Sequence, residues 1–463
     1  MFGPGVYRPD PTEGITAIAD LPPPEIVPYS RNDKRHPCPR CGHSAYRDKQ
    51  LQRTLHDLGN LDLWCPRDLV VTYAQHYCTQ CRKYFHADLS ALAPPGGQYT
   101  HRVIDLAVRL VVEDGLPYRP ASWHLWRDHR VIVPFATIQN WVEAGEKKAQ
   151  SRMDTAFLDW ALADFSGYVA ADELYDGPFC ILSAVDNRCY KRILYDVFDH
   201  DPTHEDIRAF LGRLKTALAA RDLTLLGMST DGSPLSPTPL AEVFRGVPHQ
   251  LCQFHVVQDI VQAVVQAVAC ERKRLAAQQP KVPRGRPRTQ AAKQAVRTKK
   301  RLAAQGAALF AARYLFVQRH LNKTERKTLW CVNRGLPQLQ ALRTVMDQVY
   351  ALFDRRCRTQ TALDKLATLR RRLQRFPQVG ETLKKLFAPT LEKARTFLDD
   401  KLLPSTSNAV ERGNRRYRKM QKSVYRVRTQ AQISARLALD MWREAHAEGR
   451  QQTLASLHRA RAG

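Results

Sequence analysis

The sequence lacks any apolar run long enough to cross a bilayer, and its first residues lack the charged-then-apolar pattern of a secretory signal peptide. We therefore expect a protein that works without a membrane. No internal repeat is present either. At 463 residues the chain is too long for one ordinary hydrophobic core, so we expect two to four domains.

Acidic residues are scarce relative to basic ones. The 45 Asp and Glu residues are outnumbered by 72 Lys and Arg residues, which gives a net charge of +27. Residues 271–301 alone hold twelve basic residues and one acid, Glu271, so this segment contributes 12 − 1 = +11. A charge of this size predicts a polyanionic partner, and nucleic acid is a better match than a membrane surface.

The eleven cysteines do not form a disulfide framework, because only four of them are paired in the sequence. These four form two Cys-x-x-Cys motifs, which favours metal binding in a reducing compartment. Tetrahedral Zn²⁺ suits four thiolates, and a site with four protein ligands is structural. The two motifs are farther apart than in compact zinc ribbons, so other ligands and two unrelated buried pairs stay possible. The predicted ligands are Cys38, Cys41, Cys78 and Cys81, with Cys65, His36 and His43 as possible substitutes.

Patterning along the chain predicts a multidomain α/β protein. Proline is frequent at the start, strand-like and helical runs alternate in the middle, and nearly everything after that is helical. The expected parts are a disordered arm over 1–30, a zinc-binding domain over 31–94, a helical domain over 100–150, an α/β domain over 160–265, a helical insertion over 266–400, and a return to the α/β domain over 401–450.

The segment after the linker "APPGGQYT" reads as helix, turn, helix and a third helix starting in "VPFATIQNW". Polar residues Thr137, Gln139 and Asn140 stand near the front of that third helix. This resembles a helix-turn-helix module, whose last helix reads base edges in the major groove. An ordinary three-helix bundle is the alternative. In either case Trp123, Trp126, Ile138 and Trp141 are expected to form the small core.

Acids stand at the expected ends of two strands in the α/β region. "GYVAADELYDG" ends in Asp172, Glu173 and Asp176, and "LTLLGMSTDGSP" places Asp231 just past a later strand. The order of three meander strands, a helix, a strand and a helix resembles the ribonuclease H-like fold, in which these two strands are neighbours. Asp172 and Asp231 would then face each other as Mg²⁺ ligands. Glu173 is expected to point to the other face of its strand.

One carboxylate stands at the head of the basic segment "LPSTSNAVERGNRRYRKMQKS". Asn408 and Glu411 fit a capping box, in which the acid lies near a positive helix N-terminus. Glu411 is also a candidate third metal ligand, and both roles can coexist. The cations after it recur at intervals of three and four, so many share a face suited to phosphates. The cations expected to contact DNA are Arg412, Arg415, Arg416 and Lys419.

Four short motifs occur together in order: "AADELY", "STDGS", "CQFH" and "TSNAVERGNRR". With them, the chain over about 31–445 resembles a DDE transposase of the insertion-sequence type, related to the Mutator-like and hAT-like branches. The resemblance implies a ribonuclease H-like core interrupted by the helical insertion, with 411 − 231 = 180 positions between the last two acids. It implies that Asp172, Asp231 and Glu411 bind Mg²⁺ or Mn²⁺, and that Cys252 and His255 lie beside them. A core cysteine and an ordinary helix-start histidine remain the alternative for this pair.

The resemblance further implies that the protein binds transposon ends, cuts DNA at them and joins the freed 3′-hydroxyl to double-stranded target DNA. Joining two ends implies a homodimer or a larger assembly, and a prokaryotic host implies a cytoplasmic, nucleoid-associated protein. Two rivals stay open. One is a domesticated regulator that only binds DNA, and the other is a structure-specific nuclease of the same fold.

The segment "PRGRPR" resembles an AT-hook, in which arginines lie flat in a narrow A·T minor groove. The arginines concerned are Arg284, Arg286 and Arg288. The alternative is a flexible basic linker that contacts only the DNA backbone. Trp330, in the helical insertion, could stack on an unpaired base, but a tryptophan in the core is the default expectation.

Overall fold

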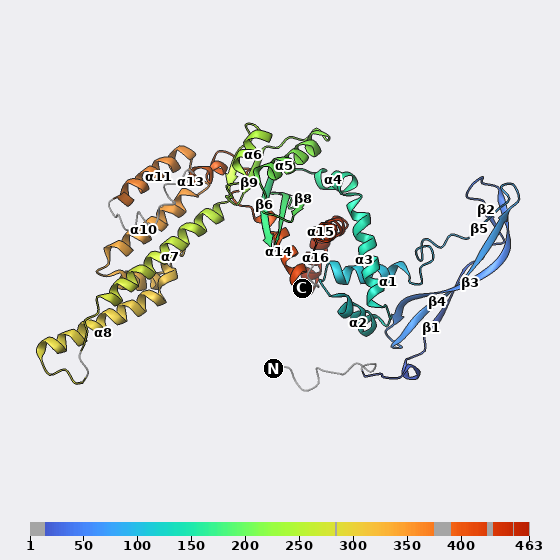
Figure 1. Cartoon of the computed structure of the whole chain (residues 1–463), viewed down its shortest axis with the longest axis horizontal. Coiled ribbons are helices and arrows are strands. Elements are labelled where there is room, and N and C mark those ends of the chain that lie inside the picture. The colour runs from blue at the N-terminus through green and yellow to red at the C-terminus, as the bar shows by residue number, and fades with distance from the viewer. Residues whose placement is uncertain (1–13, 283–284, 375–389, 424–428, 448, 463) are drawn as a thin grey trace. The chain divides into compact units, whose positions relative to one another are not determined.

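The computed structural model describes residues 14–282, 285–374, 390–423, 429–447 and 449–462. The chain divides into two compact units (Figure 1). The first unit comprises Met1–Trp160 and Arg415–Gly463, and the second comprises Ala161–Asn414. Among the described residues, no helix combines the length and the apolar character that crossing a membrane requires.

A five-stranded sheet begins the first unit. Its strands follow the order β1-β4-β3-β2, with β5 paired to β4. β1 runs parallel to β4, and the other pairs are antiparallel. The strands are β1 (Glu25–Arg31), β2 (Arg35–Pro37), β3 (Ser44–Asn60), β4 (Cys65–Cys78) and β5 (Lys83–His86).

One sequence expectation about this region is wrong. The arm expected to be disordered over 1–30 includes β1, because an alternating apolar stretch pairs with β4 at the sheet edge, where proline is tolerated at position 28. Residues 1–13 of that arm lie outside the described residues. The segment predicted as a linker has turns and bends, and it is hydrogen-bonded to β3, since the His56 backbone donates to Gln98 and accepts from Thr100.

Helices complete the first unit. They are η1 (Ile18–Asp20), α1 (His101–Val112), α2 (Tyr118–His129), α3 (Phe135–Gln150), η2 (Met153–Phe157), α4 (Leu158–Leu162), whose end passes into the second unit, α15 (Gln430–Ala445) and α16 (Arg450–Ala462). Ile138 is fully buried and Trp126 nearly so, as predicted. Trp123, however, is 46% exposed, so its predicted place in the core is wrong.

From sequence, "QISARLALDMWREAHAEG" is an amphipathic helix expected to pack on the α/β domain. In the structure the apolar face of this helix, α15, packs against α3 instead. A buried ion pair joins the two helices, with Arg436 Nε donating to Glu146 Oε1. Arg436 also donates to the Tyr118 hydroxyl at 2.9 Å. Amphipathic spacing predicts that a helix has a partner, but it does not say which partner, and this prediction failed at that point.

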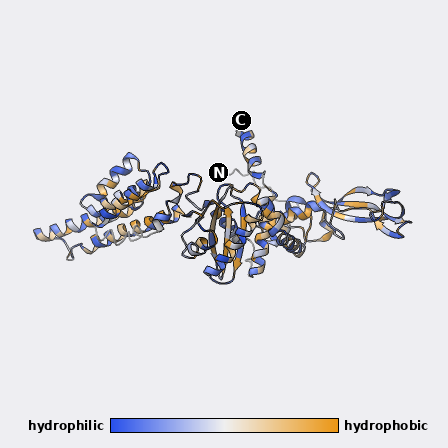
Figure 2. Cartoon of the chain, turned by 90° about the horizontal axis from the view of Figure 1, so that it is seen from above, coloured by the Kyte–Doolittle hydropathy of each residue, from blue (hydrophilic) through white to orange (hydrophobic). Residues whose placement is uncertain are grey.

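The second unit contains a sheet with strand order β10-β9-β6-β7-β8. β6, β7 and β8 form an antiparallel meander, while β9 and β10 run parallel to β6. Most strand residues are buried, and hydrophobic residues concentrate in these strands (Figure 2). The strands are β6 (Tyr168–Asp176), β7 (Phe179–Asp186), β8 (Arg192–Phe198), β9 (Gly227–Thr230) and β10 (His249–Leu251).

Two helices connect the later strands of this sheet. They are α5 (His204–Ala219) and α6 (Pro237–Val243). In sequence, the acids and histidines of "DHDPTHED" suit either a metal cluster or, better, a loop and a capped helix, with Thr203 and Asp206 three residues apart. The capped helix is confirmed, because the Thr203 side chain accepts from the Asp206 backbone and Asp206 accepts from the Thr203 backbone.

The helical insertion packs around a hydrophobic core of leucine, valine and phenylalanine side chains on successive helices, which continues to Tyr168 on β6 and Leu251 on β10. Its elements are α7 (Gln253–Ala277), α8 (Gln290–Ala311), η3 (Arg313–Phe316), α9 (Lys323–Asn333), α10 (Pro337–Leu352), α11 (Thr359–Gln374), α13 (Thr390–Lys393) and η5 (Thr396–Leu398). Trp330 on α9 does not belong to this core, because 64% of its surface is exposed. The default expectation for that residue is wrong.

The insertion leaves the sheet and returns to it at one place. The Gln253 backbone donates to Ser405 O at 2.8 Å, and the Ser407 backbone donates to Cys252 Sγ at 3.4 Å. Asn187 adds a side-chain bond to Thr406 O at 3.0 Å. These contacts hold the start of α14 (Asn408–Ser423) against the end of β10. These contacts therefore set the position of Glu411 in the first turn of α14.

Candidate metal centres

Two groups of metal-ligating side chains form among the described residues, and each was expected from the sequence in outline. One consists of four cysteines in the first unit, and the other consists of carboxylates in the second unit.

The cysteine cluster sits where two β-hairpins turn. Cys38 and Cys41 lie between β2 and β3, while Cys78 ends β4 and Cys81 lies in the turn between β4 and β5. Because β3 pairs with β4, the two turns come together at one end of the sheet. The four sulfur atoms lie within 4.8 Å of one another, which is compatible with a zinc ion.

Local backbone geometry shapes both turns. In the first, the Cys38 N–H donates to His43 O and the Gly42 N–H donates to Cys38 O, each at 2.8 Å. Gly42 has φ +72°, a conformation that glycine adopts without steric cost. Arg82 follows the second pair with φ +53°, so both turns use a left-handed residue just after their last cysteine.

The thiols of this cluster differ in acidity. Backbone hydrogen bonds from Arg40 and Cys41 lower the pKa of Cys38 to about 7. The pKa of Cys81 rises to about 12, chiefly because of its hydrogen bond with Cys41 and its burial. Four sulfurs this close disfavour several negative charges without a cation, and a bound metal ion removes that penalty.

The possible substitute ligands do not join the cluster. Cys65 begins β4 whereas Cys78 ends it, and at about 3.3 Å per residue the 78 − 65 = 13 steps amount to about 40 Å. His36 packs its ring against His76 and Phe85.

The carboxylate cluster forms at one edge of the second sheet. β6 pairs with β9 in parallel register, with Tyr168, Val169 and Ala170 opposite Gly227, Met228 and Ser229. Continuing that register by two residues places Asp231 beside Asp172. Carboxylate oxygens of Asp172, Glu173 and Asp231 all lie within 4.8 Å of one another, a group compatible with Mg²⁺.

Two details differ from the sequence expectation. Asp172 does not end its strand, because β6 continues to Asp176 through its pairing with β7. Glu173 does not stay on the far face. β9 ends at Thr230, so β6 has no paired neighbour on that side at the level of Glu173. The Glu173 carboxylate lies within 4.8 Å of the Asp231 carboxylate. Glu173 Oε1 is buried without a hydrogen-bond partner.

Glu411 stands beside this group, in the first turn of α14. Its Oε1 lies 4.0 Å from His255 Nε2. Its negative charge is close enough to raise the pKa of Asp172. The expected capping box is wrong, because α14 already includes Asn408, and Ser407 O accepts from the Val410 and Glu411 backbones.

Sequence reasoning missed Asn414. Its Nδ2 donates to Asp172 Oδ2 at 2.7 Å, and only 2% of its surface is exposed. Asn414 lies three residues after Glu411, so both point to the same side of α14. That spacing was the only signal in the sequence.

The acids of this site have strongly raised pKa values. Burial, together with Asp231, Glu411 and Glu173, raises the pKa of Asp172 to about 8. Burial and Asp231 raise the pKa of Glu173 to about 7, against hydrogen bonds from Ser233 and Ser236. A divalent cation would favour the ionised forms instead.

Cys252 and His255 stand at the start of α7. Cys252 follows β10 and is the residue before α7, and His255 lies in the first turn of that helix, where its Nε2 is near Glu411. Hydrogen bonding with Cys252 raises the pKa of His255 to about 9. Burial raises the pKa of Cys252, but hydrogen bonds with His255 and Ser407 outweigh it and lower that pKa to about 7. The raised pKa favours the protonated form of His255, whose Nε2 lies 4.0 Å from Glu411 Oε1.

The residues expected to contact DNA have different environments. On α3, Gln139 and Asn140 are exposed and Thr137 is half-buried; Gln139 donates to Glu143 at 2.8 Å. Of the hook arginines, Arg286 and Arg288 are exposed, while Arg284 lies outside the described residues.

The cations of α14 also differ from one another. The Arg412 guanidinium lies 4.5 Å from the Tyr190 ring centre. Arg415 and Lys419 are exposed. Arg416 donates to Asp440 at 2.8 Å and to Glu444 at 3.4 Å, so its charge is already paired.

No model of a known protein family matches the chain, and no curated protein matches it.

Proposed function

We propose that the chain is a DDE transposase, which cuts DNA at transposon ends and joins the freed strand to target DNA with the help of divalent metal ions. The observation that carries the proposal is the grouping of Asp172 with Asp231, with Glu411 near them. Asp231 follows β9 in register with Asp172 on β6, and their oxygens lie within 4.8 Å of each other. Glu411, on α14, stands outside that group, but it is near enough to raise the pKa of Asp172, and its Oε1 lies 4.0 Å from His255 Nε2.

The sheet supports the same proposal. Its order, with three antiparallel strands first and two parallel strands added beside β6, fits the ribonuclease H-like core that the sequence resemblance implies. The residues Gln253 to Asp400 then correspond to the helical insertion of such a core. The first and second acids would come from β6 and the end of β9, as the resemblance requires.

The residues of the site have distinct roles in this proposal. Asp172, Asp231 and Glu411 would hold Mg²⁺ or Mn²⁺, which activates a hydroxyl nucleophile and stabilises charge on the leaving oxygen. Asn414 fixes one oxygen of Asp172, so the other is left for a ligand role. His255 balances the negative charge beside Glu411. Glu173 is a further candidate ligand because of its free buried oxygen.

The other parts would bind and position DNA. We propose that the four cysteines hold a structural Zn²⁺, since four protein ligands leave no open position on the metal. The exposed Gln139 and Asn140 on α3 would read the transposon end as part of a helix-turn-helix. Synapsis of two ends calls for a homodimer or larger assembly.

Cleavage of the element's own end DNA tests the proposal. Wild type is assayed with Mg²⁺ or Mn²⁺ beside Glu411→Gln, which keeps the side-chain shape and removes the charge. Glu242→Gln is the matched control, because Glu242 makes only a surface ion pair with Arg208 in the same unit. We expect wild type and the control to cut and join, and Glu411→Gln to bind DNA but do neither.

Other outcomes point elsewhere. If Glu411→Gln cuts and joins like wild type, Glu411 is not a metal ligand and the proposed site is wrong. If wild type cuts without joining, a structure-specific nuclease replaces the transposase. If wild type binds DNA and never cuts it, the binding-only regulator is the better description.

A further inference from the structure

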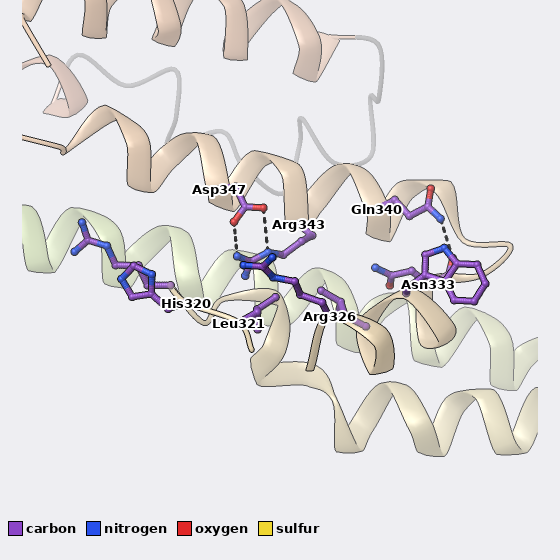
Figure 3. A pocket seen from close by; sticks show the side chains of 10 residues that line it. His320, Leu321, Arg326, Asn333, Gln340, Arg343 and Asp347 are labelled. Atoms are coloured by element: carbon purple, nitrogen blue, oxygen red, sulfur yellow. Dashed lines mark hydrogen bonds and ion pairs between the residues drawn. The ribbon is translucent and has the colours of Figure 1, made fainter. Parts of the chain in front are cut away.

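The helical insertion contains a pocket that none of the roles above uses. It has a volume of about 680 Å³ and lies where the segment after η3 meets α9 and α10. Figure 3 shows His320 toward one end, Asn333 and Gln340 toward the other, and Arg326 between them. A volume of this size is typical of pockets for small molecules.

The pocket has a net positive lining. Arg319, Arg326 and Arg343 face it together with one carboxylate, Asp347. Arg343 is committed to the fold, since it donates to three backbone carbonyls and forms an ion pair with Asp347. The charge that remains for a ligand is therefore that of Arg319 and Arg326, both exposed. Two guanidinium groups in one pocket suit a phosphate.

Two further residues of the lining suit a part of a ligand other than a phosphate. Asn333 is only 4% exposed, and its Oδ1 is buried without a hydrogen-bond partner, so a ligand that donates an N–H to it would remove an energetic penalty. Trp330, on the same helix and in the same lining, is 64% exposed, and the Arg334 guanidinium lies 5.9 Å from its ring centre. An exposed indole beside a buried acceptor suits a flat ring that carries N–H groups.

We propose that this pocket binds a single nucleotide, with its phosphate on Arg326 and Arg319, its base against Trp330 and a base N–H donated to Asn333 Oδ1. A nucleotide is the ligand class that combines these three features. The nucleotide can be a free nucleoside phosphate or one unpaired nucleotide of a DNA strand, which present the same chemistry. The inference does not depend on the carboxylate site, because binding requires neither metal nor strand cleavage.

Calorimetric titration of the full chain with adenosine 5′-monophosphate, without divalent metal, tests the proposal. Arg326→Ala and Trp330→Ala are compared with Lys327→Ala, which removes an exposed charge from the next position of α9 but does not line the pocket. Loss of a stacking or phosphate contact should weaken binding at least about fivefold, and Lys327→Ala should bind like wild type. Purine riboside 5′-monophosphate, which lacks the exocyclic amine, should bind wild type more weakly than adenosine 5′-monophosphate. Circular dichroism verifies that each variant is folded.

Competition then separates the two sources of the nucleotide. If duplex DNA with one unpaired nucleotide displaces the monophosphate and fully paired DNA does not, the pocket binds a strand nucleotide. If neither DNA competes, it binds a free nucleotide. The proposal is overturned if wild type shows no saturable binding, or if Arg326→Ala and Trp330→Ala bind like Lys327→Ala. It is equally overturned if inorganic phosphate binds as tightly as the nucleotide.

Discussion

Replacing Asp172 by asparagine should stabilise the metal-free protein, although it removes a proposed metal ligand. Asp172 is 6% exposed, and its pKa is raised from 3.8 to about 8. The unfolded chain loses the Asp172 proton near pH 4, while the folded chain keeps it until about pH 8. The contribution of Asp172 to the free energy of unfolding therefore becomes more unfavourable as pH rises between these values.

The size of this effect follows from the pKa values. The difference 8 − 3.8 is 4.2 pH units, or about 6 kcal/mol at roughly 1.4 kcal/mol per unit, and all of it applies above pH 8. Near pH 7 the cost is about 4 kcal/mol, and near pH 5 it is about 2 kcal/mol. Asparagine avoids this cost. Its side-chain oxygen still accepts from Asn414, so the hydrogen bond at that position is kept.

Thermal unfolding of wild type and Asp172→Asn at about pH 5 and about pH 7 measures the effect. In magnesium-free buffer the variant should have the higher Tm at the higher pH, by several degrees, and a smaller advantage at the lower pH. Added Mg²⁺ should raise the Tm of wild type, because the ion binds only the folded state, and should leave the variant unchanged. Asp222→Asn is the control, since Asp222 is exposed and has a left-handed backbone that asparagine tolerates.

Either of two results would refute this reasoning. A variant with a lower Tm than wild type at both pH values would mean that the buried Asp172 carboxyl group does not destabilise the folded protein. An equal response of both proteins to Mg²⁺ would mean that Asp172 does not hold the ion.

Further predictions concern the first unit. Cys78→Ser should lose about one zinc per chain in atomic absorption, while Cys65→Ser should keep it because that thiol lies at the other end of β4. Glu146→Gln should destabilise the unit by about 3–5 kcal/mol in denaturant unfolding, because the buried Arg436 charge loses its partner; an unchanged midpoint would contradict this. Gly59→Ala should cost about 1–3 kcal/mol in the same assay, since a Cβ there would lie 2.6 Å from Cys65 O and 2.8 Å from Arg130 O; wild-type stability would show that the backbone can relax.

Much of the two candidate metal sites could be predicted from short local patterns in the sequence. A Cys-x-x-Cys motif specifies its own turn, so two such motifs on paired strands suffice to bring four sulfurs together. Asp172 and Asp231 could be placed together because the order of the elements resembles a fold in which their two strands are neighbours. Their meeting depends on parallel register rather than on strand ends, and the pattern did not fix that detail.

What the sequence missed depends on tertiary contacts. Alternation along a strand assigns Glu173 to the far face, but the end of β9 lets its long side chain reach around the sheet edge. Arg436 and Glu146 are 436 − 146 = 290 positions apart, and no local pattern links them. The partner of an amphipathic helix is set by such contacts, so the packing of α15 on α3 could not be read from its spacing.

The return of the chain to Cys252 after the helical insertion has a consequence for the evolution of this protein. Gln253 and Ser405 are hydrogen-bonded neighbours although 405 − 253 = 152 positions separate them. Closing so long an excursion costs entropy that grows only with the logarithm of its length, and doubling the length adds about 0.6 kcal/mol. Loop closure therefore sets little limit on the length of the insertion while Gln253 and Ser405 stay hydrogen-bonded. We expect homologous chains to vary in length between Asp231 and Glu411 more than in the segments that carry these residues.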